Sequence, residues 1–173
     1  NWDGELDFIV FSFNEATGEV VKLRLTGIVD AIREAGIEVS DDQVIWIDPQ
    51  SSAGTIEAKQ MGTDFLTAHP DAKKILFATV NDQSAQGFLS AVETSNRTDD
   101  CIIVSHGADD PGLFNLKEDT IWLGSTAYFP ERYGDYIMQM ILDLADGKEL
   151  AKETYIDNVF IDRSNVGEYY PNN

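Results

Sequence analysis

Several polar side chains follow apolar segments of the sequence, and they could form hydrogen bonds with a small ligand. Ser12 and Asn14 lie near the end of the first apolar segment, and Arg24 lies near the start of the helix predicted after it. Asn81 and Asp82 follow a later apolar segment. A planar guanidinium donor and an amide that both donates and accepts suit the hydroxyl pairs of a neutral polyol. Each residue also has a structural alternative, either as a helix-surface side chain or as a helix cap.

The chemistry of catalysis has less support in this sequence. His106, Asp109 and Asp110 fall close together and could form a metal site or an acid/base cluster, but a solvated loop is the simpler interpretation. The sequence lacks the GxGxxG motif after a strand, the GxxxxGK[ST] phosphate loop and the GxSxG nucleophile motif. We therefore predict a protein that is not an enzyme and that has no cofactor and no bound metal.

Charge excludes two kinds of partner. The chain has 31 acidic residues against 12 Lys and Arg, which gives a formal net charge of -19. Such a surface repels phosphate groups, so we expect no nucleic-acid partner and no binding to an anionic membrane surface. Residues 1–20 lack the residue order of a signal peptide, and we expect the chain to start as a mature or trimmed product. The single cysteine, Cys101, lies in an apolar run and is expected to be buried.

The elements that must position these residues alternate between strands and helices. Short apolar runs predict strands at residues 6–13, 44–47, 74–80, 101–105 and 120–125, with a strand-like stretch at 155–161. Apolar residues at spacings of three and four predict helices at residues 21–35, 55–68, 82–92 and 130–145, and a short helix at 113–116. No repeat or linker interrupts this order.

Continuous apolar strands separated by helices are typical of a parallel sheet that is buried on both faces. We predict an α/β fold with a parallel sheet of about five strands and helices on both faces, as in flavodoxin-like domains. In such sheets the ligand site lies beyond the carboxyl ends of the strands. The candidate loops are therefore residues 12–24, 48–55, 79–84, 105–112 and 125–129.

Several segments of the sequence are similar to one family of binding proteins. They are residues 65–71 (FLTAHPD), residues 75–82 (ILFATVND) with Ala85 and Gly87, Arg24 with Gly27, residues 125–130 (STAYFP) with Gly134, and residues 164–166 before 169–171. In these segments the chain resembles the sugar-binding periplasmic proteins of ABC transporters, of the ribose-binding type. The resemblance covers nearly the whole chain but only the carboxyl-terminal lobe of that two-lobed family, and it implies a type I periplasmic binding protein fold.

The resemblance also implies roles for single residues. The arginine of the family's binding cleft falls on Arg24, and the asparagine of the cleft falls on Asn81. The glutamine at the hinge of the family is replaced by Tyr128, which can stack on a sugar face and donate through its hydroxyl. Asn14 and Asp82 are further candidates for ligand binding.

Two further positions depart from the family's pattern, which makes three of five. The hydroxyl-binding aspartate falls at about Gly107, so Asp109 would substitute for it only if the loop shifts. The aromatic residue that stacks on the sugar falls near Ala53, where Gln50, Ser51 and Ser52 are weaker candidates. Pentose specificity is therefore not transferred, and we expect a ligand that is larger, less hydroxylated or anionic near Arg24.

The resemblance implies that an amino-terminal lobe is missing. Family members trap the sugar between two similar lobes, and this chain begins at Trp2, near the first crossing into the second lobe. The chain would cross back near Tyr128, so the helical segment 129–150 would pack on the missing lobe. Its apolar stripe comprises Phe129, Tyr133, Ile137, Met140, Ile141 and Leu144. We expect the 130–145 helix to dock on a second copy, as a homodimer, or to fold back onto its own sheet.

These observations predict the carboxyl-terminal solute-binding lobe, residues 1–173, of the extracytoplasmic component of an ABC transporter. It would capture a sugar or similar small polar ligand with its amino-terminal lobe and engage a membrane permease, in the periplasm or tethered outside the cell as a lipoprotein. The alternative is the effector-binding core of a sugar-responsive, LacI-type transcription repressor, which shares the fold. An upstream helix-turn-helix would favour the repressor, and an upstream signal peptide would favour transport.

Overall fold

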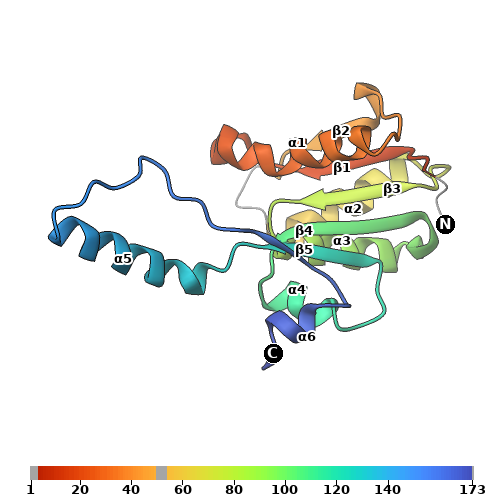
Figure 1. Ribbon diagram of the computed structural model, residues 1–173. Coiled ribbons are helices and arrows are strands. Elements are labelled where there is room, and N and C mark those ends of the chain that lie inside the picture. The colour runs from red at the N-terminus through yellow and green to blue at the C-terminus, as the bar shows by residue number, and fades with distance from the viewer. Residues whose placement is uncertain (1–3, 50–53, 173) are drawn as a thin grey trace.

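The structure, a computed structural model, describes residues 4–49 and 54–172 and is built around one β-sheet (Figure 1). In the described residues the strands are β1 (Phe8–Ser12), β2 (Val44–Ile47), β3 (Ile75–Thr79), β4 (Cys101–Gly107), β5 (Trp122–Ala127) and β6 (Val159–Ile161). Their order across the sheet is β2-β1-β3-β4-β5-β6. All neighbours are parallel except β5 and β6. The order of the first five strands is the flavodoxin-like order, as predicted.

Helices connect the strands. They are α1 (Glu19–Glu34), α2 (Thr55–Ala68), α3 (Asp82–Thr94), α4 (Asp110–Asn115), α5 (Tyr133–Ala145) and α6 (Val166–Tyr169). Four short 3-10 turns accompany them: η1 (Glu15–Thr17), η2 (Asp41–Gln43), η3 (Thr98–Asp100) and η4 (Pro130–Arg132). Within the described parts of the chain, no helix combines the length and the apolar character needed to cross a membrane.

The two faces of the sheet have separate cores. Phe77 and Ile103 face the side on which Phe65 of α2 and Phe88 of α3 pack. Alternate strand residues, including Phe11, face the other side, which α1 covers in part. Because both sides of β1 and β3 are buried, these strands are apolar throughout rather than alternating. This burial explains why the strands could be predicted from the sequence.

The sheet differs from the prediction at its far edge. The strand-like stretch 155–161 contributes only the three residues of β6, and these pair antiparallel with β5. β4 continues to Gly107, beyond the predicted end at residue 105, because Gly107 pairs with Ala127. His106 therefore lies on a strand, and its prediction as a loop residue is wrong.

Helix α5 stands apart from the sheet (Figure 1). It begins after η4 at the carboxyl edge and points away from the body. None of its residues, all of which the structure describes, is buried, and Ile137 and Leu144 are more than half exposed. The prediction that this helix folds back onto its own sheet is therefore wrong. Phe129, assigned to the same stripe, is instead buried against Tyr169 and Tyr170 in the body.

Candidate functional site

Arg24 and Tyr128 meet at the carboxyl edge of the sheet. The Nη1 of Arg24 donates to the Tyr128 hydroxyl at 3.0 Å and to the carbonyl oxygen of Val80 at 3.4 Å. The guanidinium carbon lies 4.7 Å from the centre of the Tyr128 ring. Val80 precedes Asn81, so Arg24 and Asn81 share one rim, as the sequence predicted. The contacts hold an exposed guanidinium in place at the point where the chain leaves β3 and β5.

A cavity of about 610 Å³ opens beside this pair. Its lining includes Arg24, Tyr128 and His106 from the body, Tyr133 at the start of α5, and Tyr155 from the segment after α5. Burial raises the pKa of Tyr128, and the neighbouring Arg24 opposes the rise. The phenol therefore stays protonated at neutral pH and can donate to a ligand while it accepts from Arg24. The size of the cavity suits a small polar molecule.

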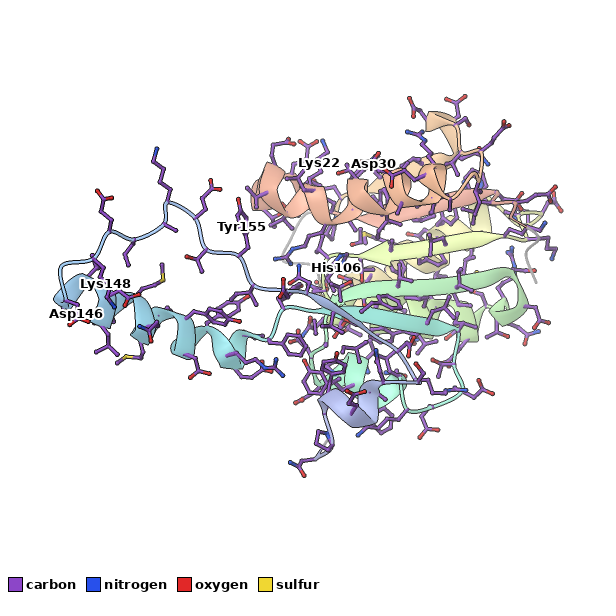
Figure 2. The ribbon with its side chains drawn as sticks, in the orientation of Figure 1. Lys22, Asp30, His106, Asp146, Lys148 and Tyr155 are labelled. Atoms are coloured by element: carbon purple, nitrogen blue, oxygen red, sulfur yellow. The ribbon has the colours of Figure 1, made fainter. Side chains whose placement is uncertain are left out.

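His106 is a site residue that the sequence analysis did not assign to ligand binding. It lies at the carboxyl end of β4, at the end of the sheet nearest α5 (Figure 2). Its Nδ1 lies 3.0 Å from the carbonyl oxygen of Thr79, and because a carbonyl only accepts, this nitrogen is assigned the proton. Burial lowers the pKa of His106, and the positive charge of Arg24 lowers it further. The neutral ring leaves Nε2 as an acceptor for a hydroxyl group.

Asn81 and Asn14 both hold backbone groups at this edge. Asn81 is the N-cap of α3, and its Oδ1 accepts from the backbone N–H of Ser84 at 2.9 Å. Asn14 is the N-cap of η1, and its Oδ1 accepts from the N–H of Ala16 at 2.8 Å. Ser12 at the end of β1 pairs with Thr79 at the end of β3. Asn14 and Asn81 each follow two residues later, so both asparagines lie beyond the same end of neighbouring strands. Their contact with a ligand stays a prediction.

Asp82 lies beneath the site rather than in it. Its side chain is fully buried, and its carboxylate accepts from the hydroxyls of Ser105 and Ser125 and from the N–H of Asp109, each at 2.6 Å. Trp122 Nε1 donates to Ser105 at 2.9 Å. Burial raises the pKa of Asp82, and the three hydrogen bonds oppose the rise. A direct ligand contact does not fit this position, so we regard Asp82 as a residue that positions the loop after β4.

Asp109 belongs to that loop but not to the Arg24 cavity. It is exposed and lines a separate cavity of about 640 Å³ together with Gln83 and Tyr170. Gln83 Nε2 donates to the Asp109 carboxylate at 3.3 Å. Gly107 has a φ of +130°, and a Cβ there would lie 3.1 Å from the Asp109 carboxylate. Asp109 and Arg24 thus line different cavities, and a ligand contact by Asp109 stays a prediction.

The remaining candidates divide into two sets. Gln50, Ser51, Ser52 and Ala53 lie outside the described residues. Among the residues that are described, no group of three or more His, Cys, Asp or Glu is arranged to hold a metal ion. The alternative metal cluster of His106, Asp109 and Asp110 is therefore not formed.

The fold and the site together define a ligand-binding lobe of the α/β class. Hydrogen-bonding side chains gather at the carboxyl edge of a parallel sheet, which is where such sheets bind small molecules. The chain belongs to the periplasmic binding protein domain family, whose sequence profile matches residues 2–149. None of the curated protein sequences matches the chain.

Several solved structures with a similar fold are solute-binding or sugar-binding proteins. An ABC transporter periplasmic solute-binding protein from Actinobacillus succinogenes, with bound D-allose, has a TM-score of 0.78 at 16% identity and matches 95% of this chain and 56% of its own. A solute-binding protein from Agrobacterium vitis with bound allitol has a TM-score of 0.77 at 19% identity, and the match covers 98% of this chain and 58% of that protein. A glucose-galactose binding protein from Geobacillus stearothermophilus has a TM-score of 0.70 at 16% identity, and the match covers 94% of this chain and 55% of that protein. The chain thus spans little more than half the length of these proteins, which are binding proteins rather than enzymes.

Proposed function

We propose that this chain is the carboxyl-terminal lobe of an extracytoplasmic solute-binding protein that serves an ABC transporter. The ligand is a sugar or a similar polyol, held between this lobe and an amino-terminal lobe of the same protein and released to a membrane permease. The single observation that carries the proposal is the Arg24–Tyr128 pair on the rim of a cavity of about 610 Å³. The family and the solved neighbours, which bind allose, allitol and hexoses, favour transport over a repressor core.

The chemistry of the rim suits hydroxyl groups. Arg24 supplies fixed donors, Tyr128 supplies a donor and a ring face, and neutral His106 supplies an acceptor. Each sugar hydroxyl both donates and accepts, so these three groups can satisfy it without a formal charge on the ligand. The lobe performs no catalysis in this proposal: closure of the second lobe over the ligand is the signal to the permease.

The other partners follow from the same proposal. Helix α5, with its exposed apolar side chains, packs on the amino-terminal lobe, and a homodimer through this helix is the alternative. The intact protein works outside the cytoplasmic membrane, and a lipid tether is a further part of the proposal. Because this chain supplies one side of the cleft, its own affinity is expected to be far below that of the two-lobed protein.

The test uses the full-length protein, which is screened against sugars and polyols by thermal shift and then measured by calorimetry. Arg24→Ala removes charge-assisted hydrogen bonds worth about 1.5–3 kcal/mol, so affinity for the best ligand should fall about 10- to 100-fold. Asn81→Ser removes the amide but keeps an N-cap, which separates ligand contact from helix stability. Arg163→Ala, at an exposed ion pair with Asp119, is the matched control. Unchanged affinity in both Arg24→Ala and Asn81→Ser would refute the site.

A further inference from the structure

The cavity beside Arg24 differs in charge from the rest of this acidic chain. The chain has 31 Asp and Glu residues against 12 Lys and Arg. In the part of the chain that the structure describes, none of these carboxylates lines the cavity, whereas Arg24 does. The second cavity at the same edge of the sheet shows the contrast, because Asp109, Asp110 and Glu131 all line it. Of the two cavities at this edge, the one that contains a cation is therefore the one without acidic side chains.

The positive charge of Arg24 is not neutralised by the described residues. Three other arginines each form an ion pair with an aspartate, namely Arg33, Arg97 and Arg163. Arg24 forms no such pair with the residues at positions 4–49 and 54–172, and its partners there are the neutral Tyr128 hydroxyl and Val80 carbonyl. Asp82, the carboxylate beneath the site, already accepts three hydrogen bonds of its own. A counter-charge for Arg24 must therefore come from another molecule or from another part of the protein.

One edge of the Arg24 guanidinium is available for a ligand. Both hydrogen bonds of Arg24 use Nη1, and its Nε and Nη2 have no hydrogen-bond partner among the described residues. The N–H groups of Nε and Nη2 are parallel, and this fork matches the two oxygens of a carboxylate. The Tyr128 ring, 4.7 Å from the guanidinium carbon, helps to fix the orientation of the fork. A carboxylate can therefore bind here side-on, through two parallel charge-assisted hydrogen bonds.

The other polar side chains of the lining suit hydroxyl groups. Thr126, Tyr128 and Asn158 each combine a donor and an acceptor, and neutral His106 accepts through Nε2. The cavity of about 610 Å³ is within the usual range for small-molecule sites. A ligand that matches this lining carries several hydroxyl groups and one negative charge.

We propose that the solute is a sugar acid, whose carboxylate binds the Nε–Nη2 fork of Arg24 and whose hydroxyls bind Tyr128 and Thr126. This inference rests on the proposed function, because it names the chemical class of the solute that the two lobes enclose. Closure of the second lobe removes water from Arg24, and an enclosed charge without a counter-charge is costly. A carboxylate on the ligand removes this cost, so the site prefers a sugar acid to the neutral sugar of the same shape.

Two other sources of a counter-charge for Arg24 are outcomes of the test. A sugar phosphate carries a charge of about -2, but Arg24 is the single Lys or Arg in the described lining of the cavity. A carboxylate of the second lobe would also neutralise Arg24, and the protein would then prefer a neutral sugar. The three cases differ in which ligand binds most tightly.

The deciding experiment compares matched ligands on the full-length protein by titration calorimetry. The pairs are sodium D-galacturonate with D-galactose, sodium D-glucuronate with D-glucose, and sodium D-gluconate with D-glucitol, and galactose-1-phosphate is the phosphate probe. At least one sugar acid should bind about 10- to 100-fold more tightly than its neutral partner. This preference should shrink when NaCl rises from about 0.05 M to about 0.5 M, because salt screens the charge.

The other results separate this inference from the proposed function. Equal or tighter binding of the neutral sugars, or tighter binding of the phosphate, would overturn the sugar-acid assignment and leave the solute-binding function in place. If none of the sugars, sugar acids and phosphates bound, the assignment and the proposed function would both be overturned.

Variants of Arg24 separate its charge from its hydrogen bonds. Arg24→Gln keeps a donor but removes the charge, so affinity for the sugar acid should fall about 10- to 100-fold and affinity for the neutral sugar about 3-fold or less. Arg24→Lys keeps the charge without the fork and should lie between Arg24→Gln and the unaltered protein. Lys59→Gln, at an exposed lysine of α2, removes the same charge elsewhere and should change neither affinity. Equal losses for the acid and the neutral sugar in Arg24→Gln would show that the charge is not recognised and would overturn the proposal.

Discussion

Removing the Asp82 carboxylate should destabilise the lobe far more than removing any exposed carboxylate. In Asp82→Ala, three buried donors lose their acceptor: the hydroxyls of Ser105 and Ser125 and the N–H of Asp109. A stranded buried donor costs about 1–3 kcal/mol, but the hydroxyls can rotate, and Ser105 has the Gly124 carbonyl within 3.5 Å. We therefore expect a loss of about 3–5 kcal/mol in the free energy of unfolding.

The isosteric change Asp82→Asn should cost less. An amide at position 82 keeps one acceptor for the N–H of Asp109, and its NH₂ group can donate to the serine hydroxyls. We expect a loss of about 1–2 kcal/mol. The pH dependence should also change. Burial raises the pKa of Asp82 above its value in the unfolded chain, so the folded state binds more protons between these two pKa values. The stability that this residue contributes at acidic pH therefore declines as the pH rises from the unfolded pKa through the folded pKa. Asp82→Asn abolishes this decline.

The assay is urea unfolding of each variant in the full-length protein, followed by fluorescence at several pH values. Trp122 donates to Ser105 and is buried, so it reports directly on the network. Asp99→Asn, an exposed carboxylate change of equal charge, is the control and should alter stability by less than about 0.5 kcal/mol. If Asp82→Ala were as stable as this control, the carboxylate would not hold the loop, and the positioning role would be refuted.

Four further predictions concern the same edge of the sheet and its core. Burial lowers the pKa of His106 below 6.5, so the stability of the fold should fall as the pH drops through that value. In His106→Gln the melting temperature should depend less on pH between about pH 8 and about pH 5. Gly112→Ala should destabilise by about 1–3 kcal/mol in urea, because its Cβ would lie 2.3 Å from an Asp82 oxygen. Ala108→Gly should stabilise by up to about 1 kcal/mol, since Ala108 has a φ of +53°. Burial raises the pKa of Cys101 to about 12, so a thiol reagent should react only on unfolding; rapid native labelling would contradict this.

The fold could be predicted because burial determines the sequence pattern. Strands β1 and β3 are covered on both faces, so they are continuous apolar runs, and α1 and α3 show apolar residues at helical spacing. The length of β6 was overestimated, because its extent depends on pairing with β5 at the edge of the sheet and not on the local sequence. The position of α5 also could not be derived, because an apolar stripe indicates that a helix needs a partner but not where the partner lies.

The site was predictable only in part. Arg24 and Tyr128 follow from the rule that ligand sites lie at carboxyl strand ends, together with the family resemblance. His106 was missed because β4 was ended too early, and its strand position depends on the pairing of Gly107 with Ala127. Asp82 was assigned to the ligand because sequence position cannot distinguish a side chain at the rim from one beneath it. Its burial results from Ser105 and Ser125 on two other strands.

The two bare apolar surfaces connect folding with binding. An apolar groove of about 530 Å³ beside α1 ends at His106 and Thr126, and α5 begins shortly after Tyr128, so both surfaces border the cavity beside Arg24. In the proposed two-lobed protein, docking of α5 on the second lobe would fix the segments that carry Tyr133 and Tyr155 in the wall of this cavity. This docking would reduce the freedom that a ligand would otherwise have to restrict on binding. In the proposed two-lobed protein, docking of α5 on the second lobe should therefore raise the affinity beyond what that lobe's own contacts with the ligand contribute.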